Sequence, residues 1–116
     1  MKLFLDDIRE APDKTWVVVR SYFEFVEAVR KHGNEIIEIS FDHDLGEDAH
    51  GSLAPTGMDA AKYFVDKFMI EEEGYGQLLL KVNVHSSNPA GRKNIGSYFE
   101  SAKKHGLLNQ GISITY

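Results

Sequence analysis

Short apolar runs alternate along the chain with segments in which apolar residues recur every three to four positions. The runs have the length of strands and are rich in branched side chains. They cover residues 2–5, 16–20, 35–41 and 78–84, with a weaker run at 111–116. Because strands that alternate with helices form parallel units, the pattern predicts an α/β fold with a mainly parallel sheet of four to five strands.

Three segments of helical period lie between or after these runs, and each has its own start signal. Apolar residues repeat at Tyr22, Phe25, Val26 and Val29, at Ala61, Phe64, Val65 and Phe68, and at Ile95, Tyr98, Phe99 and Ala102. The start signals are Ser21 with Glu24, Thr56 with Asp59, and Asn88 with Pro89. In "RKHG" and "KKHG", we expect His32 and His105 to lie on the surface at helix C-termini.

The connection between the first two strands is unusually short. Only Ile8–Thr15 separates them, whereas a parallel crossover commonly needs a dozen residues or more. Either an extended loop replaces the crossover helix, or residues 16–20 form an antiparallel edge strand. We favour the extended loop, with the strand order 2-1-3-4-5.

Composition narrows the class of protein. The 116 residues suit one domain, 1–116, and the net charge of −5 argues against gripping duplex nucleic acid, which needs a basic surface. The chain has no cysteine, so thiol catalysis and thiolate metal sites are excluded. Neither a signal peptide nor an apolar run of membrane-spanning length is evident, so we expect a cytoplasmic protein.

Ionisable residues follow three of the predicted strands, in "DDIR", "DHDLG" and "HSSN". In the order 2-1-3-4-5 these strand ends share one edge of the sheet, where ligands of such folds bind. The residues gathered there would be Asp6, Asp7, Asp42, His43, Asp44 and His85. Because four carboxylates repel one another unless a cation lies among them, Mg²⁺ is the natural ligand of this edge.

The histidines differ in what their positions indicate. His85 opens the loop after a strand, where a side chain with a pKa near neutrality can act as an acid or a base. His43 is either a second catalytic group or a buried histidine that points away from the site. His50 lies in a long polar loop at 46–57, and we expect it to be exposed.

Two further stretches could bind an anion. Ser86, Ser87 and Asn88 lead into a helix whose first turn carries Arg92, and helix amides with an arginine attract phosphate. The alternative is a plain helix cap. Arg9, after the first strand, would add a second positive charge or pair with a neighbouring acid.

Four motifs in this order resemble the cyclic-phosphate-processing receiver domains, a divergent branch of the response-regulator receivers. They are "FLDDIR", "FDHDLG", "TGMDAAKYF" and "VHSSNPAGRKNI". The resemblance implies a flavodoxin-like, three-layer α/β fold. It also implies that Asp6 and Asp7 match the metal-binding acidic pair, that Asp42 matches the phosphoacceptor, and that His85 replaces a threonine or serine. Ordinary receivers have a helix after the first strand and a lysine after the fifth, and this sequence has neither.

The expected function is that of a metal-assisted phosphoesterase acting on a cyclic phosphate, carried by a 2′,3′-cyclic nucleotide or an RNA end. Asp6, Asp7 and Asp42 would bind Mg²⁺ or Mn²⁺, and His85 and His43 would form an acid–base pair. Asp44 would orient a histidine, while Ser86, Ser87, Asn88, Arg92 and Arg9 would hold the phosphate. Two alternatives remain: a non-catalytic module that binds a cyclic nucleotide or another phosphoanion, and a phospho-switch with Asp42 as acceptor.

Overall fold

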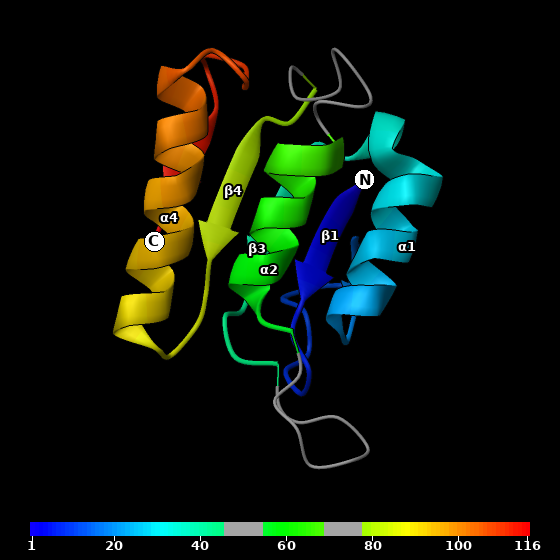
Figure 1. The fold of residues 1–116 in the computed structure, drawn as a ribbon. Helices are drawn as coiled ribbons and strands as arrows, with labels where there is room; N and C mark the ends of the chain where they lie inside the picture. The colour runs from blue at the N-terminus through cyan, green and yellow to red at the C-terminus, as the bar shows by residue number, and fades with distance from the viewer. Residues whose placement is uncertain (46–54, 69–77) are drawn as a thin grey trace.

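The computed structural model describes residues 1–45, 55–68 and 78–116, and five parallel strands form its centre (Figure 1). The strands are β1 (Lys2–Leu5), β2 (Trp16–Val19), β3 (Glu38–Phe41), β4 (Lys81–Val84) and β5 (Ser113–Thr115). Their order is β2-β1-β3-β4-β5, and every neighbouring pair is parallel. The predicted order is confirmed, and the second strand runs parallel rather than antiparallel.

The helices are α1 (Tyr22–His32), α2 (Gly57–Lys62) and α4 (Pro89–Lys104). A short 3₁₀ turn η1 (Gly33–Glu35) follows α1, and α2 continues as the π-helical segment η2 (Tyr63–Phe68). The predicted start signals are confirmed, since the side chains of Ser21, Thr56 and Asn88 each accept a hydrogen bond from an amide three residues on. None of the helices in the described ranges is long and apolar enough to cross a membrane.

The two histidine-glycine ends differ. Gly106 has φ of +78°, a conformation that favours glycine, and it ends α4 beside His105, whose Nδ1 lies 2.8 Å from the Ser101 carbonyl. Gly33 instead has φ of −53° and continues into η1, while His32 pairs with Glu35 at 3.0 Å. His50 and most of the loop at 46–57 lie outside the described residues.

One face of the sheet is covered by helices. Side chains at alternate strand positions point into the apolar core beneath them: Leu3, Leu5, Ile39, Phe41, Val82 and Val84. The connections from β2 to β3, β3 to β4 and β4 to β5 all cross the sheet in the same direction. Because such connections are right-handed, α1, α2 and α4 lie on the same face, as Figure 1 shows.

The other face has no helix among the described residues, and we call it the open face. It carries the alternate strand positions Lys2, Phe4, Trp16, Glu38, Ser40, Lys81 and Asn83. A helix between β1 and β2 would cover this face, because that connection crosses the sheet in the opposite direction. The predicted absence of this helix is confirmed, so the described elements form two layers where the resemblance implied three.

Candidate functional site

The site lies at the carboxyl ends of three neighbouring strands. The backbone pairing of the sheet continues one residue past each strand, because the amides of Asp6, Asp42 and His85 donate to carbonyls of the adjacent strands at 2.9–3.1 Å. Asp6 and Asp42 are buried, with exposed fractions of 0% and 6%. Carboxylate oxygens of Asp6, Asp7 and Asp42, one from each, lie within 4.8 Å of one another. The acidic cluster expected from the sequence is therefore present.

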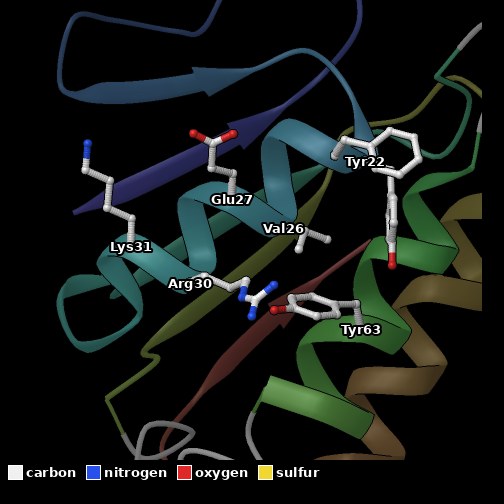
Figure 2. A pocket seen from close by; sticks show the side chains of 7 residues that line it. Tyr22, Val26, Glu27, Arg30, Lys31 and Tyr63 are labelled. Atoms are coloured by element: carbon white, nitrogen blue, oxygen red, sulfur yellow. The ribbon is translucent and has the colours of Figure 1, made fainter.

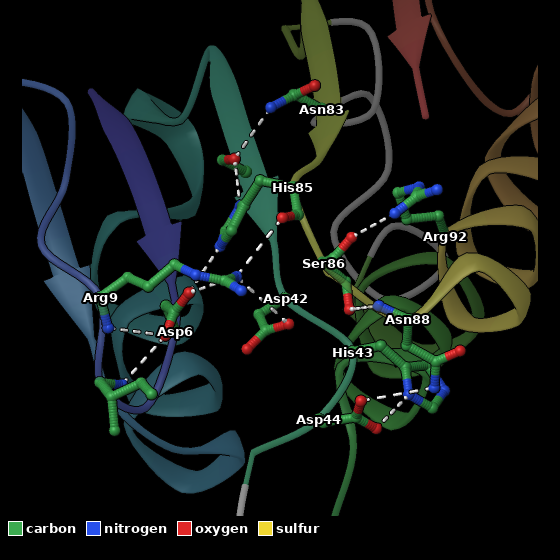
Figure 3. A network of polar contacts seen from close by, with 12 residues as sticks. Asp6, Arg9, Asp42, His43, Asp44, Asn83, His85, Ser86, Asn88 and Arg92 are labelled. Carbon is green, nitrogen blue, oxygen red and sulfur yellow. Dashed lines mark hydrogen bonds and ion pairs between the residues drawn. The ribbon is translucent and has the colours of Figure 1, made fainter.

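Asp6 is the most constrained of the three carboxylates. Its Oδ1 accepts hydrogen bonds from the amides of Ile8 (3.0 Å) and Arg9 (2.9 Å). Its Oδ2 lies 2.9 Å from Nε2 of His85 and accepts from Nη1 of Arg9 at 3.3 Å. Burial alone raises the pKa of Asp6, but the hydrogen bonds from Arg9, Ile8 and His85 outweigh it and leave the pKa below its ordinary value. Asp6 is thus an ionised carboxylate with four donors (Figure 3).

Asp7 has the opposite electrostatic balance. Burial, followed by the negative charges of Asp6 and Asp42, raises the pKa of its carboxyl group. Positive charge nearby would relieve this repulsion. Arg9 supplies some of it, since its Nη1 lies 3.3 Å from Asp6 and 3.9 Å from Asp42. Three converging carboxylate oxygens also suit a hard divalent cation, so this cluster could bind a metal ion.

His85 ends a chain of hydrogen bonds that crosses the open face, and Figure 3 shows its part from Asn83 to His85. Thr115 donates to Asn83 (2.7 Å), and Asn83 donates to Oγ of Ser40 (3.3 Å). Oγ of Ser40 lies 2.7 Å from Nδ1 of His85. Because Ser40 already accepts from Asn83, its own proton is available to Nδ1, and the ionised Asp6 accepts from Nε2. Neutral His85 therefore carries its proton on Nε2.

Aromatic packing fixes the plane of the same imidazole. The ring of Phe4 stacks on His85 with centroids 4.4 Å apart and planes within 7°. Trp16 meets Phe4 edge-on at 5.8 Å. The sequence reasoning did not select Ser40, Asn83 or Phe4. A signal was available, because each lies two residues before a site residue and side chains two apart in a strand share a face.

His43 belongs to a second group of residues. Its Nδ1 lies 2.8 Å from the carboxylate of Asp44, which also accepts from the side chain of Asn88 at 3.4 Å. The hydrogen bond from His43 is the largest cause that lowers the pKa of Asp44. A methyl group on Gly91 would lie 2.5 Å from the His43 ring, so this ring packs against the start of α4. Among the described residues, His43 and His85 share no hydrogen-bond partner.

The predicted phosphate-binding residues are partly engaged with one another. Nη1 of Arg92 donates to the carbonyl of Ser86 at 2.7 Å, and Oγ of Ser86 accepts from the Asn88 amide at 3.1 Å. Ser87 is exposed. Asn88 caps α4, in agreement with the alternative interpretation of this stretch. Of the predicted phosphate contacts, Arg9 is the one that lies among the carboxylates.

The glycine of "TGMDAAKYF" has a structural role beside the site. The amide of Gly57 donates to the His43 carbonyl at 2.8 Å. A side-chain carbon on Gly57 would lie 1.8 Å from the Asp42 carbonyl oxygen. The start of α2 can therefore approach the end of β3 this closely only with glycine at that position.

Among the cavities formed by the described residues, two differ in their relation to the carboxylate cluster. One of about 700 Å³ lies on the outer side of the helices, with Tyr22, Val26, Arg30 and Tyr63 among its walls (Figure 2). It contains none of the predicted site residues. Another of about 370 Å³ lies on the open face and includes His85 and Arg9. The second cavity is thus continuous with the site.

Comparison with known families agrees with this arrangement. The family described as the cyclic-phosphate processing receiver domain matches residues 1–101, a range that includes all four motifs and the cluster of Asp6, Asp7 and Asp42. A search among curated proteins and one among solved structures each found no match. On the extent of the family match, the chain belongs to the cyclic-phosphate processing receiver domain family.

Proposed function

We propose that this protein is a metal-assisted phosphoesterase that opens the cyclic phosphate of a 2′,3′-cyclic nucleotide or an RNA end. The observation that supports it best is the contact of His85 Nε2 with the buried carboxylate of Asp6, beside two more carboxylates and Arg9. Membership of a family associated with cyclic-phosphate processing points to the same class of substrate.

In this proposal Asp6, Asp7 and Asp42 hold the divalent cation, Mg²⁺ or Mn²⁺. When bound, such a cation neutralises charge on the phosphate oxygens and makes a coordinated water more acidic. The guanidinium of Arg9 lies 3.3 Å from Asp6 and 3.9 Å from Asp42. A phosphate bound at these carboxylates would therefore be within reach of Arg9, which would contact one of its non-bridging oxygens. The raised pKa of Asp7 supports the assignment, since carboxylates that repel one another favour a cation between them.

His85 is proposed as the acid. Opening the ring forms a bond between a water oxygen and phosphorus and breaks the P–O bond to one ribose oxygen. A base must accept the proton that the water loses, and the leaving ribose oxygen needs a proton. As an imidazolium, His85 would give the leaving oxygen the proton of Nε2, the nitrogen that faces the carboxylate cluster, while its Nδ1 would donate to Oγ of Ser40. His43, which is paired with Asp44 and packs against the start of α4, is proposed as a second acid–base group. Ser86, Ser87 and Asn88 from the loop after β4, and Arg92 from the first turn of α4, would line the phosphate.

A non-catalytic phosphoanion-binding module is the second candidate. It is favoured because both ring nitrogens of His85 already have partners within the protein. The carboxylate of Asp6 likewise already has four hydrogen-bond partners there. The phospho-switch with Asp42 as acceptor has less support, because Thr115 and Tyr116 stand at the end of β5, where receivers have lysine.

The test is ³¹P NMR of the protein with 2′,3′-cyclic nucleotides and a short RNA ending in a cyclic phosphate, with Mg²⁺ and again with EDTA. A monoester signal that requires Mg²⁺ is expected. If no product forms in either condition, the catalytic proposal fails, and calorimetric titration of the same samples then tests the binding module. Treatment with acetyl phosphate followed by intact-mass analysis tests Asp42, where an added phosphate that is lost in Asp42→Asn would favour the switch.

A further inference from the structure

The cavity on the open face has a direct physical origin. The extended loop after β1 runs beside the sheet where a crossover helix would otherwise lie, and Arg9 of this loop lines the cavity together with Phe4 and Trp16 of the strands. The result is a hollow of about 370 Å³, within the range of about 300–1,000 Å³ that small-molecule sites occupy.

The end of this hollow nearest the strand termini is the proposed active site. His85 and Arg9 line the cavity and also contact Asp6. A ligand whose phosphate lies at the carboxylates would therefore extend from His85 into the cavity. From His85 to Lys81, at its far end, the strand covers about 13 Å at the usual rise per residue. That length accommodates a ribose and one base.

The walls have the chemistry that suits a nucleobase. Phe4 is buried and contacts both His85 and Trp16, so the half-buried Trp16 is the aromatic side chain that the cavity offers to a base, and Nζ of Lys2 lies 4.6 Å from the centroid of its ring. Asn83 is half-buried in the wall, and its side-chain nitrogen and oxygen each make one hydrogen bond, which leaves one donor and one acceptor position for a ligand. An asparagine amide with a donor and an acceptor side by side is the usual partner of adenine.

Charge also favours a base over a second phosphate at the far end. Glu38 and Lys81 are register partners across β3 and β4, so their opposite charges offset each other there. The other two charged residues of the lining are Arg9 and Glu10, and the guanidinium of Arg9 lies beside the carboxylates, 3.9 Å from Asp42. A ligand with an anionic end and a neutral, hydrogen-bonding end matches this distribution.

We infer that the open-face cavity binds the base of a cyclic nucleotide whose phosphate lies at the Asp6 cluster. This rests on the proposed function for the position of the phosphate. Trp16, Asn83 and Lys81 would recognise the nucleoside part of this ligand. The preferred substrates would then be cyclic nucleotides rather than cyclic phosphates in general.

The test compares 2′,3′-cyclic AMP with glycerol 1,2-cyclic phosphate, which has the same ring and no base. Binding is measured with Ca²⁺ in place of Mg²⁺, so that a cation occupies the carboxylates while turnover is slowed, by ¹H–¹⁵N NMR and by fluorescence of Trp16, the one tryptophan of the chain. We expect the nucleotide to bind at least tenfold more tightly and to shift the Trp16 indole and Asn83 side-chain signals. Equal affinity for the two ligands, or shifts confined to other parts of the molecule, would overturn the inference.

A matched pair of variants locates the base. Trp16→Leu should weaken binding of 2′,3′-cyclic AMP about tenfold, as removal of a stacking aromatic does. Phe23→Leu changes an exposed aromatic in the cavity on the outer side of the helices and should leave binding unchanged. If both variants bind equally well, the inference fails. If Trp16→Leu does not fold, the signal shifts in the wild-type protein decide.

The outcomes separate this inference from the proposed function. Equal kcat/KM for the two cyclic phosphates would leave the phosphoesterase in place and remove the base site. Tighter binding of the nucleotide without turnover would remove catalysis and leave the base site. A second copy of the chain could instead occupy the open-face cavity, and sedimentation with and without nucleotide tests this. A stable dimer whose dissociation constant is the same with and without nucleotide would overturn the inference.

Discussion

The two faces of the sheet are made from the same strands but carry different chemistry. On the helix-covered face, β1, β3 and β4 present apolar pairs that pack beneath α1, α2 and α4. On the open face the alternate residues are Phe4 and Asp6, Ser40 and Asp42, and Asn83 and His85. Because side chains alternate along a strand, one segment can stabilise the fold on one side and position reactive groups on the other.

His43 shows the same rule from the opposite side. It follows Asp42 directly, so its side chain turns toward the helices and packs against Gly91 at the start of α4. Adjacent residues that look like one acid–base motif in the sequence thus belong to different surroundings. The difference between the two faces can be tested by substituting residues on each of them and comparing the effects on turnover and stability.

The largest effect is expected from the histidines. His85→Gln should lower kcat/KM for 2′,3′-cyclic AMP by about 10²–10⁴-fold, the usual contribution of a general acid. His43→Gln, its matched control, should lower it less, because His43 contacts Asp44 rather than the Asp6 cluster. Turnover is followed by ³¹P NMR, and circular dichroism checks that each variant is folded. Unchanged turnover in His85→Gln would remove His85 from the mechanism.

The next effect concerns stability, at the neighbouring positions Ile39 and Ser40. Ile39 is fully buried beneath the helices, so Ile39→Ala should lower the free energy of unfolding by about 2–5 kcal/mol. Ser40→Ala removes one hydroxyl from the open face and should cost about 1–3 kcal/mol, because His85 and Asn83 each lose a partner. Urea denaturation measures both. A larger loss for Ser40→Ala would contradict the assignment of the core to one face.

A smaller effect depends on pH through Asp6. Its pKa lies below the ordinary value in the folded protein, so its charge stabilises the fold at any pH above that ordinary value. The contribution is lost as the pH falls through the folded pKa. Asp6→Asn should therefore destabilise the protein at pH 7, and the difference from wild type should shrink toward about pH 3. Urea titrations at both pH values test this, and a difference that stays constant would contradict it.

The smallest effect, and one of opposite sign, is expected at Asp7. Its raised pKa means that its charge destabilises the fold at neutral pH, and that the penalty disappears once the carboxyl is protonated in both states. Asp7→Asn should raise Tm slightly at pH 7 and leave it unchanged near pH 3.

Added Mg²⁺ should raise the Tm of the wild-type protein more than that of Asp7→Asn, because ligand binding stabilises the folded state. Equal shifts would argue against a metal at this cluster.

The sequence alone determined the elements, their order and the residues at the strand ends. Apolar period and capping residues act over a few positions, so the helices behind Ser21, Thr56 and Asn88 and the parallel sheet could be predicted. Strands also start or end a few residues from the predicted bounds, as at residues 35–41, where η1 includes the first residue of the run and β3 begins at Glu38.

Only the tertiary structure decided which side chains meet. The chain from Thr115 through Asn83 and Ser40 to His85 joins residues from three strands, and no local pattern specifies it. Arg92 bonds to the Ser86 carbonyl, and Arg9 lies among the carboxylates, because their directions depend on neighbours distant in sequence. A local pattern sets backbone conformation, whereas the partners of a polar side chain are set by the packing of the whole sheet.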